Sequence, residues 1–217
     1  MSKAIHHYSF IDHLIISVDQ AIKTLSHQAE NTNRSVPKTP IISLEPLSPE
    51  ENQLSARLMR VNHAGEISAQ ALYYGQAWAA QDISTRDLLW HAAKEEGDHL
   101  IWCQARLQEL NSHTSYLNPL WYTGSFMIGA IAGIVGDKQS LGFLAETEHQ
   151  VEQHLTSHLE KLPDNDYASR AILEQMRIDE QQHAEKAIEQ GGVEPPFSIK
   201  ILMKITSKIM TTLSKYI

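Results

Sequence analysis

Two short stretches decide how this chain folds: Glu96-Gly97-Asp98-His99 and Glu180-Gln181-Gln182-His183. Each stretch places a carboxylate three residues before an imidazole, and positions i and i+3 lie on the same face of an α-helix. Two such pairs, each joined by one further buried glutamate from a neighbouring helix, form the ligand set of a di-iron or di-manganese site in a four-helix bundle. The pattern therefore predicts an all-α protein with a buried metal site, if both pairs face the interior.

The spacing alone does not establish such a site. A chain of 217 residues with 12 His and a high content of Glu contains about one Glu-x-x-His pair by chance. Three pairs occur, and the third lies in Glu146-Thr147-Glu148-His149. Because a single pair on a helix is more often a surface pair than a metal site, the helical phase of each pair has to decide.

Helical phase places both opening pairs in the interior. The apolar stripe around Glu96 and His99 consists of Leu89, Ala92, Ala93, Leu100, Cys103 and Leu107. The stripe around Glu180 and His183 consists of Leu173, Met176, Ala184, Ala187 and Ile188. An amphipathic helix turns such a stripe toward the core, so we expect all four side chains to be buried.

The third pair differs from these two, because its Glu does not lie on the apolar face of its helix. Glu148 continues the apolar stripe of its own helix, which consists of Leu141, Leu144, Val151, Leu155 and Leu159. Glu146 lies two residues earlier and therefore points about 200° away. We expect Glu148 to be a ligand, and Glu146 with His149 to be a solvated coincidence.

Glu66 is the fourth candidate carboxylate, because it shares a face with Met59, Asn62, Ala69 and Tyr73. Thirty residues separate Glu66 from Glu96, and 32 separate Glu148 from Glu180. Nearly equal steps are expected if two helical hairpins, related by a pseudo-two-fold axis, each supply one lone Glu and one Glu-x-x-His pair.

Four ionised carboxylates in an apolar interior would strongly destabilise the fold unless cations accompany them. Four carboxylates balance two divalent metal ions, and two neutral imidazoles complete the ligand set. Oxygen-rich sites that contain imidazole suit iron or manganese better than a closed structural zinc site. Asp179, directly before Glu180, is a candidate acceptor for an imidazole N–H. We expect most other histidines, among them His91 and His158, to be ordinary surface or helix-end residues.

The rest of the chain divides into helices and short breaks. The expected helices cover residues 9–29, 48–81, 84–110, 137–161 and 166–190, and residues 30–46 form a polar linker. Ser48-Pro49-Glu50-Glu51 is a typical helix start, Ser84 and Asp137 are the expected caps of later helices, and Gly191 is a stop signal. No segment alternates with period two. The predicted fold is an all-α four-helix bundle with additional N-terminal and C-terminal amphipathic helices.

Composition limits the possible functions. A length of 217 residues and a hydrophobic content of 42% suit one domain, here residues 1–217, with a sizeable core. The single cysteine, Cys103, excludes an intramolecular disulfide framework and fits a reducing compartment. A net charge of −8 argues against nucleic acid as the main partner. Residues 1–10 lack the apolar run and cleavage site of a secretory signal.

Residues 110–136 suit contact with a membrane, because they contain no formally charged side chain. Their apolar core, residues 120–135, is short for a spanning helix, which needs about 20 residues. Gly129-Ala130-Ile131-Ala132-Gly133 is a close-packing pattern. We expect an interfacial or partly embedded helix near the mouth of the site, and the alternative is a helix or hairpin buried in the core.

Residues 197–217 are the second candidate for membrane contact, because they contain four lysines and no acid. Lys200, Lys204 and Lys208 recur every four residues, opposite an apolar face that consists of Ile201, Leu202, Ile205, Ile209 and Leu213. This pattern indicates a basic amphipathic helix that lies on a membrane surface. The alternative is a C-terminal helix that packs on the bundle with a solvated lysine face.

The chain resembles the bacterial demethoxyubiquinone hydroxylases of ubiquinone biosynthesis from about residue 10 to its end. The segments that carry the resemblance are Leu58-Met59-Arg60-Val61-Asn62-His63-Ala64-Gly65-Glu66, Glu95-Glu96-Gly97-Asp98-His99, Ala145-Glu146-Thr147-Glu148-His149-Gln150-Val151-Glu152 and Asp179-Glu180-Gln181-Gln182-His183-Ala184. The first of these segments is much more specific than Glu-x-x-His. No ligand position departs from the family pattern.

The resemblance implies a ferritin-like fold and two iron ions per chain. The implied iron ligands are Glu66, Glu96, His99, Glu148, Glu180 and His183. Of these, Glu96 and Glu180 would bridge the two ions. The implied reaction uses O2 to hydroxylate the ring of a demethoxy polyprenyl benzoquinol, the penultimate step of ubiquinone biosynthesis. Such a substrate resides in the bilayer, so the resemblance also implies a peripheral protein on the cytoplasmic side of the inner membrane, in contact with the membrane surface and with other ubiquinone-biosynthesis proteins.

Two alternative functions compete with a hydroxylase. One is a ferritin-like protein that binds and oxidises iron without an organic substrate. The other is a membrane-associated helical scaffold for quinone-pathway enzymes, in which the carboxylates are solvated. The charge-free residues 110–136 favour the hydroxylase over a soluble storage protein, which has no evident need for them.

Overall fold

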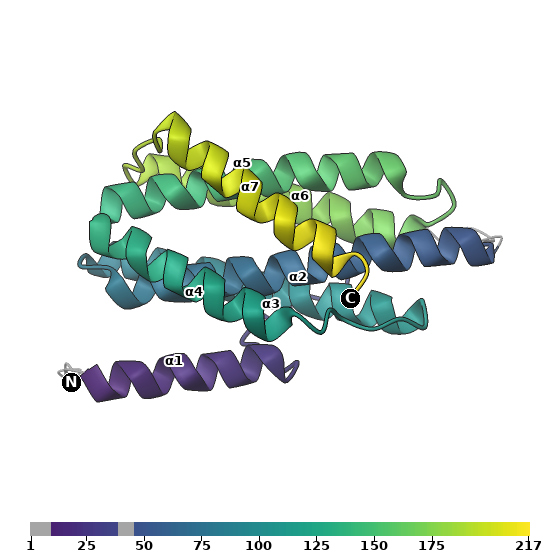
Figure 1. Ribbon diagram of the computed structural model, residues 1–217, viewed down its shortest axis with the longest axis horizontal. Helices are drawn as coiled ribbons and strands as arrows, with labels where there is room; N and C mark the ends of the chain where they lie inside the picture. The colour runs from purple at the N-terminus through teal and green to yellow at the C-terminus, as the bar shows by residue number, and fades with distance from the viewer. Residues whose placement is uncertain (1–9, 39–45) are drawn as a thin grey trace.

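The computed structural model describes residues 10–38 and 46–217, and these residues form seven α-helices and no strand (Figure 1). The helices are α1 (Phe10–Leu25), α2 (Pro49–Ala79), α3 (Ile83–Glu109), α4 (Asn118–Val135), α5 (Asp137–Lys161), α6 (Tyr167–Glu189) and α7 (Phe197–Ser214). The predicted all-α fold is confirmed. Residue 9 of the expected first helix and residues 39–45 of the expected linker lie outside the described residues.

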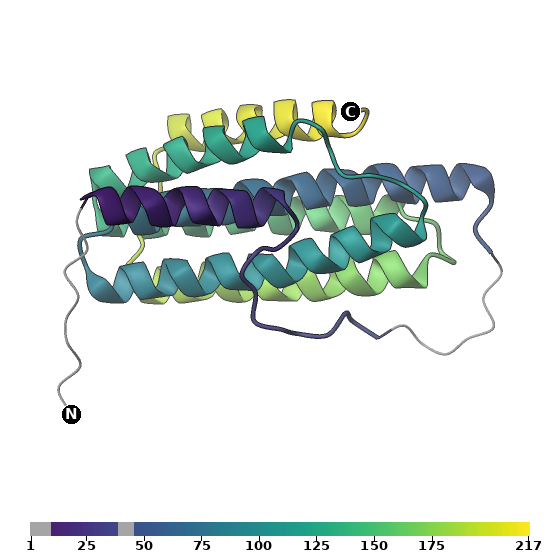
Figure 2. The same ribbon diagram turned by 90° about the horizontal axis from the view of Figure 1, so that it is seen from below.

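The four long helices α2, α3, α5 and α6 form the bundle, with α2 against α3 and α5 against α6 (Figures 1 and 2). These are the two hairpins that the spacing of the glutamates predicts. Helices α4 and α7 both lie on one side of the bundle, and α1 lies beside α2 and α4 (Figure 2). The additional N-terminal and C-terminal helices are therefore present as expected.

Two apolar layers fill the bundle, one toward each end. One layer contains Met59, Trp102, Leu107, Leu155, Leu173 and Met176. The other contains Tyr73, Leu89, Leu141, Leu144 and Ala187. On each of the four bundle helices, the candidate ligands come between residues of the first layer and residues of the second. The core thus encloses the middle of the bundle, where the polar residues converge.

The start of α2 follows the sequence signal. The Ser48 side chain accepts a hydrogen bond from the backbone N–H of Glu51, the Glu51 carboxylate accepts one from the Ser48 N–H, and Pro49 is the first helical residue. Such a capping box satisfies two donors that the first turn of a helix leaves unpaired. The predicted cap is confirmed.

The expected caps of α3 and α5 are wrong. Helix α3 is capped by Asp82, whose carboxylate accepts the Thr85 N–H at 3.2 Å, so the helix starts one residue before Ser84. Helix α5 follows Gly136, whose φ of 140° makes the sharp bend after α4. Asp137 is the first residue of α5, and its carboxylate accepts the backbone N–H groups of Gln81 and Asp82 at 3.1 and 2.8 Å. Asp137 therefore ties the α2–α3 turn to the start of α5.

Helix α4 crosses α2 in close backbone contact. A Cβ atom on Gly129 would lie 2.0 Å from the carbonyl oxygen of Leu72, and one on Gly75 would lie 2.2 Å from that of Phe126. The close-packing pattern within residues 129–133 is therefore used against α2. The opposite face of α4 is exposed and apolar, with Leu120, Met127, Ile131 and Ile134 at its surface. Helix α4 thus packs on the bundle with one face only.

Helix α7 is amphipathic as expected, but it packs only loosely on the bundle. Of its residues, all of which are described, only Ser214 is buried. Its apolar side chains face outward, with Leu202 and Ile205 59% and 52% exposed. Lys204 and Lys208 border a cavity between α7 and the bundle. Neither the outer face of α4 nor that of α7 contacts another described helix closely enough to bury it.

No helix in residues 10–38 and 46–217 combines the length and the apolar character that crossing a membrane requires. The expectation that residues 110–136 are too short to span is consistent with this finding.

The α2–α4 crossing predicts a difference between two glycines of α4. Replacing Gly129 by Ala inserts a methyl group into the Leu72 carbonyl, and overpacking of this kind costs roughly 1 to 3 kcal/mol. Gly124→Ala is the matched control, because nothing lies within 4 Å of the added methyl group and Ala favours the helix. Urea denaturation should show a lower free energy of unfolding for Gly129→Ala and an equal or higher one for Gly124→Ala. Equal stability of the two variants would contradict the close crossing.

Candidate metal centre

The six predicted ligands converge in the middle of the bundle. Helix α2 supplies Glu66, α3 supplies Glu96 and His99, α5 supplies Glu148, and α6 supplies Glu180 and His183. Each of the six is at least 97% buried. The burial that helical phase predicts for these six side chains is therefore confirmed, including the weaker case of Glu66.

One half of the cluster surrounds the imidazole of His99. Its Nδ1 atom lies 3.3 Å from Glu66 Oε2, 3.1 Å from Glu96 Oε2 and 3.3 Å from Glu180 Oε1. These three carboxylates come from three different helices and all point toward the same ring nitrogen. One imidazole nitrogen and three carboxylate oxygens are thus gathered around one point.

The other half repeats this arrangement around His183. Its Nδ1 atom lies 3.3 Å from Glu96 Oε1, 3.6 Å from Glu148 Oε1 and 3.2 Å from Glu180 Oε2. Glu96 and Glu180 therefore each direct one oxygen to His99 and the other oxygen to His183. This is the geometry that two bridging carboxylates require.

The donor set fits metal ions. Two groups, Glu66/Glu96/His99/Glu180 and Glu96/Glu148/Glu180/His183, each have four ligand atoms within 4.8 Å of one another, so each could hold a metal ion. The buried oxygens Glu96 Oε1 and Glu148 Oε2 have no hydrogen bond within the described residues. Buried carboxylate oxygens without donors are costly, and a coordinated cation satisfies them.

The buried, crowded position of two of the carboxylates raises their pKa values. Burial, with additional repulsion from Glu96 and Glu180, raises the pKa of Glu66 well above its usual value. Burial and the Glu180 carboxylate raise the pKa of Glu148 to about 8. A carboxyl group with a raised pKa is held in a site that disfavours its charge, so positive charge placed among these groups stabilises the ionised form.

The two imidazoles are held by carboxylates on their outer side. His99 Nε2 lies 2.9 Å from Asp179 Oδ2, and His183 Nε2 lies 2.8 Å from Glu95 Oε2. In each case the Nε2–H donates to the carboxylate, which leaves Nδ1 free to face the cluster. The expected role of Asp179 is confirmed, with His99 as its partner.

Glu95 is the partner that the sequence reasoning missed. Asp179 precedes Glu180 yet holds the imidazole of the α3 pair, and Glu95 precedes Glu96 yet holds the imidazole of the α6 pair. The partners are therefore exchanged between the two Glu-x-x-His helices. The acidic residue before each pair was a signal that the internal repeat could have revealed.

The start of the expected linker is packed against the candidate metal centre, together with Ala29, which lies beyond the end of α1 although the sequence places it in the first helix. Residues 29–36, which we call the strap, run along α3, where the Asp98 carboxylate accepts the backbone N–H groups of Thr32 and Arg34 at 3.3 and 3.1 Å. The Arg34 guanidinium donates to Asp179 and lies 4.7 Å from the centroid of the Trp102 ring. The strap therefore covers the His99 side of the cluster, a role that the polar sequence of the linker did not indicate.

Gly97 allows the backbone of the strap to lie directly against α3. A Cβ atom at this position would be 1.9 Å from the carbonyl oxygen of Glu30. The glycine inside the first Glu-x-x-His pair thus serves backbone packing.

The His183 side of the cluster is more open than the His99 side. A cavity of about 430 Å³ reaches His183 and Glu95 from the surface between α3, α5 and α6. His91 lines this cavity and is exposed, and its Nδ1 atom lies 3.0 Å from Glu95 Oε2. His91 is a surface residue as expected, but it also contacts the carboxylate that orients His183.

Two expectations about other side chains are wrong. His158 is buried, and its Nδ1 atom lies 2.9 Å from Asn62 Oδ1, so it is not a surface residue. Glu146 is not solvated, because its carboxylate forms an ion pair with the Lys200 ammonium of α7 at 2.9 Å and its side chain is only 11% exposed. His149 is exposed, and the pair Glu146/His149 takes no part in the cluster.

Tyr73 is a further contact that was not expected. Its hydroxyl donates to the Glu148 carboxylate from within the core. Tyr73 shares a face with Glu66 on α2, so the helical phase could place it near the cluster but could not name its partner.

The helical bundle and the buried cluster define a class of protein, the ferritin-like bundles that could hold metal ions on paired carboxylates and imidazoles. The sequence comparisons are more specific. Residues 53–214 match the family described as ubiquinone biosynthesis protein COQ7.

Relatives named 3-demethoxyubiquinol 3-hydroxylase match nearly the whole chain. The relative from Nitrosococcus oceani is 54% identical over 209 residues, which cover 96% of this chain and 97% of the relative. The relative from Acinetobacter baumannii is 52% identical, with 97% and 99% covered, and that from Pseudomonas fluorescens is 51% identical, with 94% and 95% covered. The chain therefore belongs to the ubiquinone biosynthesis protein COQ7 family, and the resemblance seen in the sequence is confirmed.

The raised pKa of Glu148 predicts that this candidate ligand destabilises the folded protein when no metal ion is bound. Burial raises the pKa of Glu148 to about 8, so in the presence of a chelator at pH 7.5 the fold disfavours the charged form that this carboxyl takes in the unfolded chain. Glu148→Gln replaces it with a neutral amide and keeps an oxygen that can accept the Tyr73 hydroxyl. Its free energy of unfolding should therefore equal or exceed that of the unmodified chain, by on the order of 1 kcal/mol.

The matched control for this stability test is Glu152→Gln, which removes the same charge from a neighbouring turn of α5 outside the cluster. It should leave the stability nearly unchanged. A clear loss of stability for Glu148→Gln under chelation would show that the ionised carboxylate is not disfavoured in the fold.

Proposed function

We propose that this chain is a di-iron monooxygenase that uses O2 to hydroxylate the ring of a demethoxy polyprenyl benzoquinol in ubiquinone biosynthesis. The observation that carries the proposal is the pair of fused clusters, each with three carboxylates and one imidazole, in a chain whose relatives are named 3-demethoxyubiquinol 3-hydroxylase. Glu66, Glu96, His99, Glu148, Glu180 and His183 would hold the two iron ions, with Glu96 and Glu180 between them.

The charge and the chemistry of the donors support iron. Four carboxylates neutralise two divalent ions, and the mixture of oxygen and imidazole donors suits iron or manganese. Two iron ions, when bound, supply the electrons that activate O2 for insertion into an electron-rich ring. Family membership favours iron over manganese.

The surroundings of the cluster prepare the site for this chemistry. Asp179 and Glu95 fix the imidazole rings so that Nδ1 faces the carboxylates. The Tyr73 hydroxyl holds the Glu148 carboxylate at one end of the cluster. The two apolar layers exclude bulk water above and below the site, which protects a reactive oxidant from side reactions.

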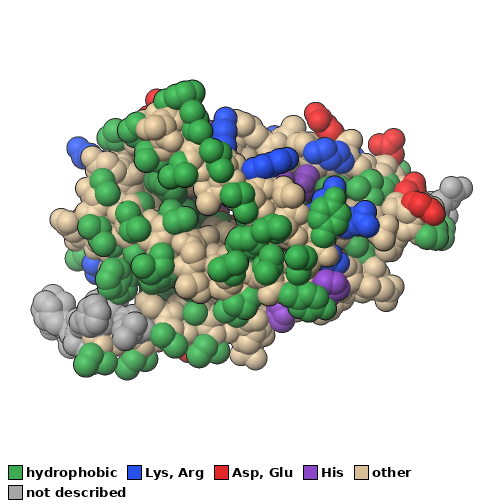
Figure 3. Space-filling model, viewed as in Figure 1, with side chains coloured by type: hydrophobic (Ala, Val, Ile, Leu, Met, Phe, Trp, Pro, Cys, Tyr) green, Lys and Arg blue, Asp and Glu red, His purple; other side chains and the backbone are tan. Residues whose placement is uncertain are grey.

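A substrate that resides in a bilayer requires the protein to contact membrane, and the outer faces of α4 and α7 are suited to this. Their exposed apolar side chains include Leu120, Met127, Ile131, Ile134, Leu202, Ile205 and Ile209. Figure 3 looks onto this side, where hydrophobic side chains spread over both helices and acidic side chains appear only near the rim. Large exposed apolar surfaces of this kind are typical of membrane or protein contacts.

We therefore extend the proposal to location: the protein lies peripherally on the cytoplasmic side of the inner membrane. Helices α4 and α7 would lie in the membrane interface. The exposed stripe of α1, which contains Ile11, Ile15, Val18 and Ile22, would extend the contact. A storage protein with no organic substrate has no evident use for these stripes, which favours the hydroxylase.

Product analysis tests the proposed reaction. The iron-loaded protein, supplied with a chemical reductant, a demethoxyquinol with a short prenyl tail and 18O2, should release a product with one labelled ring hydroxyl. Iron analysis should give about two ions per chain. Glu148→Gln removes one ligand and should lower iron content and product formation together, roughly tenfold or more.

The control in the product assay is again Glu152→Gln, which should retain both iron and activity. Unlabelled product from the iron-loaded protein would exclude O2 as the source of the hydroxyl oxygen. Normal iron binding without any hydroxylated product would instead favour the ferritin-like alternative.

Vesicle flotation tests the membrane contact. The triple variant Leu202→Ser, Ile205→Ser, Ile209→Ser removes the outward apolar stripe of α7 and should weaken binding to vesicles by roughly 100-fold, because each buried apolar side chain contributes about 1 kcal/mol or more. A matched triple variant, Ile83→Ser, Ile178→Ser, Ile188→Ser, removes exposed side chains from α3 and α6 instead. Equal flotation of the two variants would exclude α7 as the contact.

A further inference from the structure

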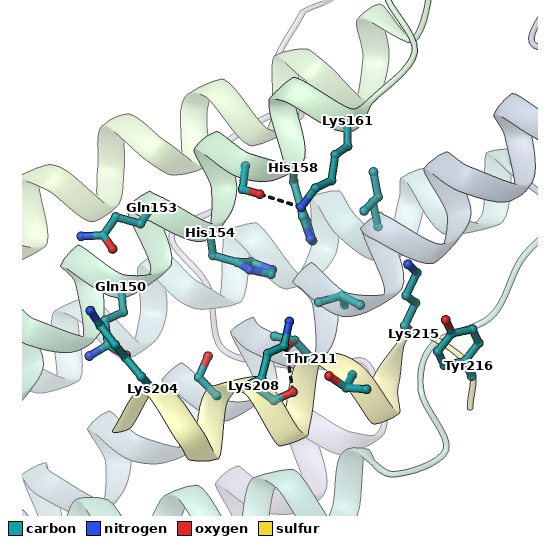
Figure 4. Close-up of a pocket in the computed structure, with 15 residues that line it drawn as sticks. Gln150, Gln153, His154, His158, Lys161, Lys204, Lys208, Thr211, Lys215 and Tyr216 are labelled. Atoms are coloured by element: carbon teal, nitrogen blue, oxygen red, sulfur yellow. Dashed lines mark hydrogen bonds between the residues drawn. The ribbon is translucent and has the colours of Figure 1, made fainter. Parts of the chain in front are cut away.

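A second cavity lies between α7 and the bundle, apart from the carboxylate cluster. It has a volume of about 630 Å³ and is lined by side chains of α2, α5 and α7. Figure 4 shows its walls, with Lys161 and His154 projecting from α5 and Lys204 and Lys208 rising from α7. None of the six candidate metal ligands lines it.

The cavity is strongly basic although the whole chain is acidic, with a net charge of −8. Four lysines line it, Lys161, Lys204, Lys208 and Lys215, and no aspartate or glutamate of the described residues does so. None of the four makes an ion pair in the part of the chain that the structure describes. By contrast, Lys200, one turn before Lys204, is paired with Glu146 and Glu194.

Helix electrostatics accounts for only part of this charge. Lys161 and Lys215 lie at the C-terminal ends of α5 and α7, where a cation favourably opposes the helix dipole. Lys204 and Lys208 lie in the interior of α7, one turn apart, and like charges at this spacing repel. Lys204 and Lys208 are exposed and have no acidic partner in the described residues, so an anion in the cavity would relieve the repulsion between them.

Two histidines form the floor of the cavity beneath the lysines. His158 is 5% exposed, and the Nε2 atom of His154 is buried without a hydrogen-bond partner in the described residues. Burial, with repulsion from Lys161 and Lys208, lowers the pKa of His154 to about 4. The floor therefore stays neutral and offers ring nitrogens, while the positive charge stands at the walls.

Hydroxyl groups complete the lining. Ser157, Ser207, Thr211 and Thr212 border the cavity, and the Lys161 ammonium lies 2.6 Å from the Ser157 Oγ. Ammonium and hydroxyl donors around one space are a typical environment for phosphate oxygens. The absence of arginine from the lining disfavours a planar carboxylate, which prefers a bidentate guanidinium partner.

We propose that the cavity between α5 and α7 binds a phosphate-bearing anion through Lys161, Lys204 and Lys208. The volume of about 630 Å³ leaves room for an organic part beside the phosphate group. The anion would fasten α7, of which only Ser214 is buried, to the bundle. Two sources share this chemistry: the headgroup of an anionic phospholipid and a water-soluble phosphate ester.

Calorimetric titration of the full chain tests the proposal and distinguishes the two sources. The probes are sodium pyrophosphate and dihexanoylphosphatidylglycerol below its micelle concentration, with dihexanoylphosphatidylcholine as the uncharged comparison. Binding of pyrophosphate supports a water-soluble phosphate ester. Binding of the glycerol lipid alone supports a lipid headgroup. Absence of binding by both anionic probes, or equal binding of the choline lipid, overturns the proposal.

Lysine variants locate the binding. The double variant with Lys204→Gln and Lys208→Gln should weaken binding of the anionic probe roughly tenfold or more. The double variant with Lys204→Arg and Lys208→Arg should retain the binding, because the charge is preserved. Lys94→Gln, Lys138→Gln removes two charges from α3 and the start of α5 and is the matched control. Equal weakening by the control overturns the proposal, because it would show non-specific attraction.

The thermal stability of the same variants provides an independent check. Without a probe, Lys204→Gln, Lys208→Gln should have an unchanged or higher melting temperature, because it relieves repulsion. If this variant does not fold, Lys161→Gln on the opposite wall must weaken binding, and unchanged binding of Lys161→Gln overturns the proposal. None of these measurements depends on metal loading or on hydroxylase activity.

Discussion

Four carboxylates buried at the centre of one bundle are the constraint on which the rest of the structure depends. Their mutual repulsion is tolerable only with positive charge among them, so the fold has to gather ligands from four helices and keep water away. The apolar layers on both sides of the cluster, one around Met176 and one around Leu144, enclose it. The bundle is thus organised around a site that would destabilise it if left without cations.

Most of this arrangement can be predicted from helical periodicity. Burial of Glu66 and Glu148, rejection of Glu146 as a ligand and the pairing of two hairpins all follow from which face of a helix is apolar. The cap of α3 was misplaced because Asp82 and Ser84 are both good capping residues, and only the actual start of the helix selects between them.

Contacts between distant segments could not be predicted in the same way. The strap contacts α3 through Arg34 and the backbone of Thr32. The strap is a short polar stretch, and such a stretch gives no periodic signal for packing of this kind. The sequence also does not predict whether the lysine face of α7 points toward the bundle or toward solvent. An amphipathic pattern shows that two faces differ, but not which of them meets the protein, and here Lys204 and Lys208 border a cavity while the apolar face is exposed.

The exchanged partners of the two imidazoles have a consequence for how the protein can be divided. His99 depends on Asp179 for its orientation, and His183 depends on Glu95. A chain cut between α3 and α5 would give two hairpins, and each would keep its own imidazole but lose the carboxylate that aligns it. Neither hairpin is therefore a self-sufficient half-site, because each depends on the other for the alignment of its imidazole.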